Sequence, residues 1–144
     1  MRGLFALPLV AFLFVYGAIA LGAPQGVYAT DAWVAEGAPG ALTLNAYVTL
    51  HNPTNENVAV IGARTNAAER VELRRYGRKG RVLGAEPRRK LVIPAGLQIR
   101  MQTQALHFAL VHLERPVKAG DTVDLILQLD SGNRLDVGAE VRKP

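Results

Sequence analysis

The side chains best suited to holding a metal in this sequence are three histidines and one internal methionine. His51 follows an alternating apolar segment, His107 and His112 lie five residues apart, and Met101 precedes both of them. Because side chains alternate along a strand, His107 and His112 are expected to face opposite sides. Imidazole and thioether groups are ligands for soft metal ions. The absence of cysteine excludes a thiolate ligand, a thiol nucleophile and a paired-cysteine redox site.

The acidic residues and the sequence motifs do not indicate an enzyme. The patterns G-x-S-x-G and H-E-x-x-H and a glycine-rich phosphate loop are absent from the sequence. His51 and His112 lie near the ends of expected strands, which is typical of histidines that form surface hydrogen bonds. The carboxylates are scattered along the chain, and they include Asp31, Glu36, Glu69, Glu72, Asp121 and Asp124. We therefore expect a non-enzymatic protein.

Alternating apolar and polar residues predict that strands position these side chains. The clearest segment is 42–51, where Leu42, Leu44, Ala46, Val48 and Leu50 share one face. Turn signals recur about every 8–12 residues, and no segment has a sustained helical period. The expected strands are 26–34, 42–51, 58–63, 70–74, 82–83, 91–93, 97–101, 107–113, 122–129 and 135–141. This pattern predicts an all-β sandwich or barrel.

Residues 1–23 are typical of a secretory signal, with a short basic start, an apolar run and small residues near the cleavage site. Ala18 and Ala20 form an A-x-A site, and Ala23 is an alternative. The apolar run is also close to the length of about 20 residues that crosses a membrane, so an uncleaved anchor is the other interpretation. In either case we expect residues 24–144 to form one exported domain, long enough to bury a core without disulfides.

Positive charge is concentrated in residues 70–90, which contain nine basic residues and only two acidic ones, Glu72 and Glu86. Two interpretations remain open: a solvated basic hairpin, or a surface that docks an acidic protein or an anionic membrane. Nucleic acid is not expected as a partner, because the protein is exported and Tyr76 is the only aromatic residue in the segment. The nine residues are Arg70, Arg74, Arg75, Arg78, Lys79, Arg81, Arg88, Arg89 and Lys90.

Five short segments, in this order, resemble the periplasmic copper chaperones of the PCu(A)C family. The segments are 31–33 (DAW), 46–52 (AYVTLHN), 68–73 (AERVEL), 93–96 (IPAG) and 113–123 (LERPVKAGDTV). The resemblance implies a single-domain, cupredoxin-like Greek-key β-sandwich. It also implies a periplasmic, non-enzymatic role in binding Cu(I) and delivering it to the copper centre of a respiratory oxidase during assembly.

The family binds Cu(I) through two histidines and two methionines. Their order is His, ten residues, Met, twenty-one residues, His, one residue and Met. Placed after the segment 68–73, these positions are Arg74, Ala85, His107 and Ala109 in this chain. The spacing is kept, but only His107 retains a ligand, and Arg74 introduces a charge that is not lost by deprotonation.

Two functions are therefore predicted as alternatives. In the first, the protein is a copper chaperone in which His107 is helped by Met101, His51 or a partner such as an oxidase subunit or another copper carrier. In the second, it is a non-metal interaction module that uses the basic 70–90 face. In that case Arg74, Arg75 and His107 surround one anion pocket. The further docking residues are Arg78, Lys79 and Arg81.

Overall fold

The computed structural model describes residues 26–76, 82–83 and 90–144 of the chain. Within them the fold is all-β, and every strand expected from the sequence is present. No helix among these residues is long and apolar enough to cross a membrane. The expected signal segment lies outside the described residues. The strands are β1 Tyr28–Ala35, β2 Thr43–His51, β3 Val58–Thr65, β4 Ala68–Tyr76, β5 Val82–Leu83, β6 Leu91–Ile93, β7 Gln98–Arg100, β8 Leu106–Leu113, β9 Thr122–Leu129 and β10 Arg134–Arg142.

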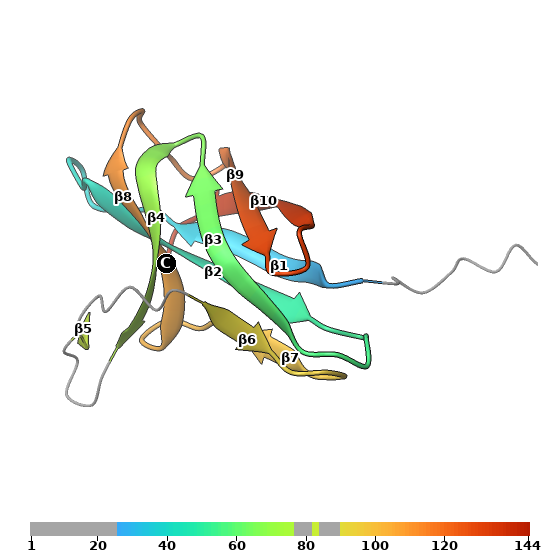
Figure 1. Cartoon of the computed structure of the whole chain (residues 1–144). Coiled ribbons are helices and arrows are strands. Elements are labelled where there is room, and N and C mark those ends of the chain that lie inside the picture. The colour runs from blue at the N-terminus through green and yellow to red at the C-terminus, as the bar shows by residue number, and fades with distance from the viewer. Residues whose placement is uncertain (1–25, 77–81, 84–89) are drawn as a thin grey trace, which may run out of the picture.

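The strands form one hydrogen-bonded sheet that bends around a core (Figure 1). Their order is β5-β4-β8-β2-β1-β10-β9-β3-β6, and β7 also pairs with β2. Strand β1 joins the two halves, because it runs antiparallel to β2 and parallel to β10. Three neighbouring pairs are consecutive in the sequence, namely β1–β2, β4–β5 and β9–β10. The other pairs join strands that are not consecutive, as expected for Greek-key connections. The predicted single β domain is therefore confirmed.

Alternating residues of the central strands build the core between the two halves of the sheet. Leu44 and Leu50 of β2 are buried, as are Leu110 of β8 and Leu125 of β9. Burying one such side chain stabilises a fold by about 1.5–3 kcal/mol. The prediction that Leu42 shares the inner face is wrong: β2 begins one residue later, and Leu42 is 66% exposed. Four further apolar residues are only partly buried against this core: Trp33, Val71, Leu73 and Ile99.

The antiparallel pairing of β4 with β8 sets the position of the candidate site. Its register places Arg74 opposite His107 and Glu72 opposite Ala109. Strand β2 pairs with the other edge of β8, with Asn45 opposite Ala109. Residues that face each other across antiparallel strands project from the same side of the sheet. These side chains therefore meet on the outer face of the sheet, away from the core.

Candidate functional site

The fold brings together three of the four positions at which the resemblance described above implies a copper ligand. Arg74 on β4 pairs directly with His107 on β8, and Ala109 lies one step further along the same face. The fourth position, Ala85, lies outside the described residues. The spacing read from the sequence therefore corresponds to real proximity for Arg74, His107 and Ala109, although only the histidine has a metal-binding side chain.

His107 is held as a neutral imidazole with one defined tautomer. Only 1% of its surface is exposed, and its Nδ1 lies 3.0 Å from the carbonyl oxygen of Ala105. A carbonyl only accepts, so Nδ1 carries the proton and Nε2 keeps the lone pair. Burial lowers the pKa of His107 below its usual 6.5, and the positive charge of Arg74 lowers it further, while the bond to Ala105 opposes both effects. The imidazole is therefore ready to act as a ligand through Nε2.

The side chain of Arg74 is tied to a carboxylate on its own strand. Its Nε and Nη2 donate to Oε2 of Glu72 at 3.0 and 2.7 Å. The other oxygen of Glu72 accepts from Nε of Arg70 at 2.8 Å. Hydrogen bonds from Arg70 and then Arg74 lower the pKa of the Glu72 carboxyl, which therefore stays ionised. An ion-pair network thus takes the place beside His107 where the resemblance implies a second imidazole.

Aromatic side chains surround the histidine on this face, although no sequence pattern predicted a role for them there. Tyr76 stacks on His107 with ring centroids 4.8 Å apart, and Tyr47 lies 6.2 Å away on the other side. Trp33 in turn packs on Tyr47 at 4.7 Å, and Asn45 donates to the hydroxyl of Tyr76 at 3.3 Å. Burial raises the pKa of Tyr47. The sequence signal for Asn45 and Tyr47 was the alternation in β2, where they lie between the inward-facing Leu44, Ala46 and Val48.

Met101 does not join His107. The backbone N–H of Met101 donates to the carbonyl of Val48 at 3.1 Å, and its side chain is 5% exposed within the hydrophobic core. Val48 belongs to the inward-facing set of β2, whereas His107 projects from the outer face. The thioether is therefore a packing group in this fold, and the prediction that it helps His107 is not supported by its position.

His51 lies at the far end of β2. Its Nε2 is 2.7 Å from the hydroxyl oxygen of Thr30, and its ring stacks on Tyr28 at 4.6 Å. It lies four positions along the strand from Tyr47, the β2 neighbour of His107. At about 3.3 Å per residue, this spacing is roughly 13 Å. Among the described residues no group of three His, Cys, Asp or Glu side chains is arranged to hold a metal ion.

The predicted anion pocket does not form as stated. Arg75 pairs with Leu106, one step from the Arg74 pair, so it projects from the opposite side of β4 and is exposed. Arg74 and His107 remain together without it. His112 lies five residues further along β8, and its Nδ1 is 2.9 Å from a carboxylate oxygen of Glu69. The remaining docking candidates, Arg78, Lys79 and Arg81, lie outside the described residues.

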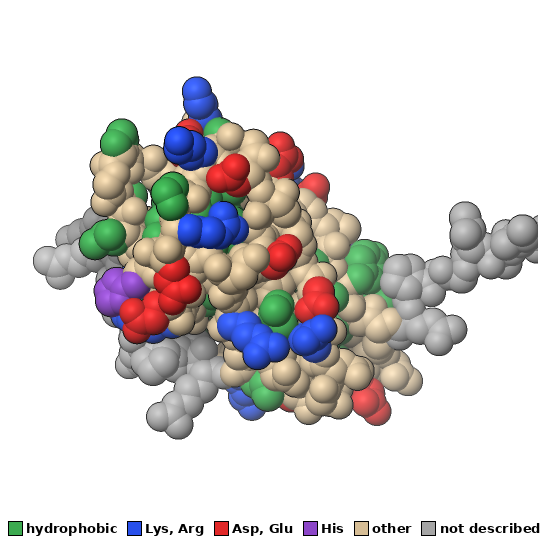
Figure 2. Space-filling view, turned by 90° about the horizontal axis from the view of Figure 1, so that it is seen from above, with side chains coloured by type: hydrophobic (Ala, Val, Ile, Leu, Met, Phe, Trp, Pro, Cys, Tyr) green, Lys and Arg blue, Asp and Glu red, His purple; other side chains and the backbone are tan. Residues whose placement is uncertain are grey.

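Several strand arginines are neutralised by an acid two residues away. Arg134 pairs with Asp136 at 3.0 Å and Arg142 with Glu140 at 3.2 Å, as Arg74 does with Glu72. Figure 2 shows one face of the molecule, on which Lys and Arg side chains lie among Asp and Glu side chains rather than in a single patch. A strong positive field must therefore come from other basic residues of the chain.

Comparison with known proteins identifies the relatives of this chain. A family model described as "Putative lipoprotein LpqE-like" matches residues 27–141. The protein named "Putative lipoprotein Lxx21020" from Leifsonia xyli subsp. xyli is 27% identical over 119 residues, which cover 82% of this chain and 70% of that protein. The match includes both strands that carry the candidate site.

Solved structures with the same fold include copper-bound proteins. The solution structure of CuI-DR1885 from Deinococcus radiodurans is 31% identical, with a TM-score of 0.65 and coverage of 88% of this chain and 83% of that chain. The copper-bound PCuAC domain from PmoF2 has a TM-score of 0.71 over 85% of this chain and 97% of that domain; at 15% identity it supports the fold alone. The resemblance drawn from the sequence motifs is thereby confirmed.

Proposed function

The chain belongs to the LpqE-like family, and from that membership we propose that it is a non-enzymatic, exported binding protein of the copper-chaperone type whose own copper site is incomplete. The observation that carries the proposal is the Arg74–Glu72 ion pair beside His107, together with Ala109 in place of a thioether. One imidazole next to a guanidinium does not form the set of soft ligands that Cu(I) prefers. The protein therefore does not carry copper alone.

Titration of the purified domain with Cu(I) against a chromophoric chelator tests this proposal. We expect no binding tighter than micromolar for the wild-type protein. Sub-nanomolar binding of one Cu(I) per chain that His107→Ala abolishes would overturn it. His112→Ala is the matched control, because that imidazole lies five residues further along β8 and is hydrogen-bonded to Glu69.

A second function is favoured by the state of His107 itself. A neutral imidazole with Nδ1 bound to a backbone carbonyl resembles a metal-ligating histidine, and such outer hydrogen bonds orient ligands in metal sites. In this alternative a partner protein supplies the remaining ligands, and copper is bound only in the complex. The proposal is supported if a mixture of this chain and a copper-carrying relative binds copper more tightly than the relative alone, and if His107→Ala in this chain removes that gain. A gain that His107→Ala leaves unchanged would reject it.

The partner we propose is an acidic protein, such as an oxidase subunit or another copper carrier, docked on the basic 70–90 segment. Arg75 is exposed on β4 and Lys90 is exposed just before β6. Neither forms an ion pair with another described residue. Clustered charge of one sign raises the rate at which an oppositely charged partner associates.

For the location of the protein we propose the periplasm, reached through the leader in residues 1–23. The family description as a lipoprotein supports export and attachment to a membrane. None of the 144 residues is a cysteine, the residue that takes thioester-linked and thioether-linked lipids. We therefore propose the leader as the candidate anchor. Carbonate extraction of membranes distinguishes an anchored chain, which stays in the pellet, from a cleaved one.

A further inference from the structure

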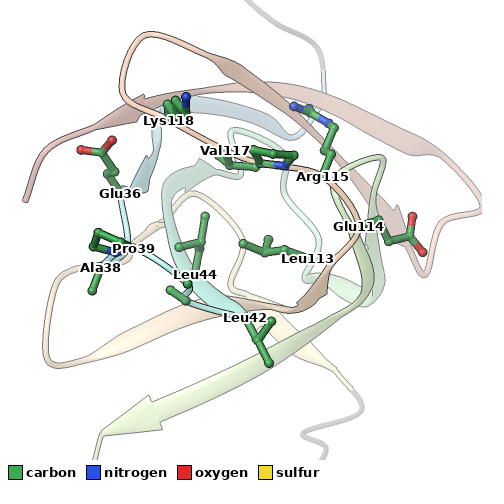
Figure 3. Close-up of a pocket in the computed structure, with 14 residues that line it drawn as sticks. Glu36, Ala38, Pro39, Leu42, Leu44, Leu113, Glu114, Arg115, Val117 and Lys118 are labelled. Atoms are coloured by element: carbon green, nitrogen blue, oxygen red, sulfur yellow. The ribbon is translucent and has the colours of Figure 1, made fainter.

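A groove opens at the end of the sandwich opposite the chain's entry into β1. It has a volume of about 600 Å³ and lies between residues 36–42, which lead into β2, and residues 113–118, which begin at the last residue of β8 (Figure 3). This volume falls in the range of small-molecule sites. Leu113 is six residues beyond His107 on β8, or roughly 20 Å at about 3.3 Å per residue, so the groove is separate from the site already described.

Apolar side chains form the floor of the groove. Leu42, Leu44 and Leu113 lie together across its middle, and Val117 and Pro39 flank them (Figure 3). Leu42 is 66% exposed, the largest exposure of any bulky apolar residue in the described part of the chain. An exposed leucine beside a concave apolar surface is typical of a ligand or docking site rather than of a core.

Hydrogen bonds and close packing hold the walls in place. The backbone N–H of Glu36 donates to Arg142 O at 2.8 Å, and Oε1 of Glu36 accepts from Ala119 N–H at 3.1 Å. Gly37 packs so closely that a Cβ there would lie 2.5 Å from a methyl carbon of Leu44. The groove is therefore formed before any ligand binds, which reduces the entropy lost on binding.

Two cations lie along one margin of the groove. Arg115 and Lys118 flank Val117 in Figure 3, and neither forms an ion pair with another described residue. Three acidic residues lie nearby. Glu36 accepts a hydrogen bond from the backbone N–H of Ala119 and Asp121 accepts one from the backbone N–H of Lys118, while Glu114 points away from the groove (Figure 3). The apolar floor and cationic margin together complement an apolar chain with an anionic head.

We propose that this groove binds a free fatty acid, with its acyl chain on the leucines and its carboxylate against Arg115 or Lys118. A free molecule fits better than the lipid of a bilayer. The chain enters β1 at Tyr28 and reaches the groove after Ala35, and eight residues of strand span roughly 26 Å. If the protein is tethered to a membrane through its N-terminal segment, the groove lies on the side away from the bilayer.

Displacement of a fluorescent polyene fatty acid by hexadecanoic acid tests the proposal with delipidated full-length protein below the critical micelle concentration. We expect saturable binding of one molecule per chain. Leu42→Asn weakens it by about tenfold or more, because the acyl chain loses a leucine contact. Ile61→Asn, at an apolar side chain 48% exposed elsewhere on the surface, leaves the affinity unchanged.

The head group is tested by combining Arg115→Gln with Lys118→Gln. This variant should lose affinity for the acid by about tenfold while binding hexadecanol as the wild type does. Three outcomes would overturn the proposal: no saturable binding, equal losses in the Leu42 and Ile61 variants, or capture by anionic lipid vesicles without binding of the free acid.

Discussion

At the scale of single residues, the candidate site is decided by what each side chain is bonded to. His107 keeps the form of a metal ligand, because Ala105 holds its tautomer and burial keeps it neutral. Arg74 does not present a bare charge to it, because Glu72 binds the guanidinium. The site therefore combines one competent ligand with an ion pair that fills the adjacent position.

The lowered pKa of His107 predicts a loss of stability in mild acid. The folded pKa lies below 6.5, so the unfolded chain takes up a proton first as the pH falls, and unfolding becomes easier. Urea unfolding should therefore show a fall in stability from about pH 7.5 to about pH 5.5 that is smaller in His107→Gln. The same fall in both proteins would show that His107 is not the group responsible. Carboxylates with lowered pKa values, such as Glu72, contribute only at more acidic pH.

Restoring two ligand positions should restore copper binding. Arg74→His combined with Ala109→Met places an imidazole and a thioether beside His107 on the same face. We expect the affinity for Cu(I) to rise by about a hundredfold or more, because each added soft ligand contributes directly. The same pair of changes in a His107→Ala background is the control. No gain in chelator competition would mean that the β4–β8 register does not bring these positions together.

At the scale of elements, the pairing of β4 with β8 positions the site, and a polar cap at the end of β2 holds the neighbouring strands. Asn52 is 1% exposed and donates to the carbonyls of Glu56 and Ile93, both at 2.8 Å. Its Oδ1 accepts from the N–H and the hydroxyl of Thr54. One side chain thus shapes the β2–β3 turn and fixes β6 to it.

Replacing the buried Asn52 should destabilise the fold more than replacing an asparagine with an exposed hydrogen bond. Asn52→Ala leaves the carbonyl of Ile93 buried without its donor, so we expect a loss of about 2 kcal/mol or more in the free energy of unfolding. Asn57→Ala removes only an exposed bond to Ala95 N–H, and should lose about 1 kcal/mol or less. Urea denaturation of the two variants makes the comparison, and equal losses would contradict the assigned role of Asn52.

At the scale of the whole molecule, charge separates the two surfaces that the proposals use. Arg74, on a strand at the site, is paired with an acid. The cations of the groove margin and the exposed Arg75 form no ion pair with another described residue. Association with an acidic partner is therefore predicted to depend on salt and on Arg75, and not on the paired arginines.

Reversing one exposed charge tests this prediction. Arg75→Glu should slow the association with poly-L-glutamate, used as an acidic probe, by severalfold at low salt and little at about 0.5 M salt, where charges are screened within a few ångströms. Arg134→Glu is the matched control, because Arg134 is already paired with Asp136. Similar association rates in all three proteins would contradict the prediction and show that the basic segment is only a solvated surface.

The strands and their alternation are local properties, so the sequence alone determined the all-β fold and the ligand-poor set Arg74, His107 and Ala109. Cross-strand contacts depend on register between segments far apart in the chain, and only the tertiary structure decided them. It paired Arg74 with Glu72, fixed the tautomer of His107, and turned Arg75 away. It also exposed Leu42 in a groove, because an alternating pattern predicts which residues share a face but not where the strand begins or what covers it.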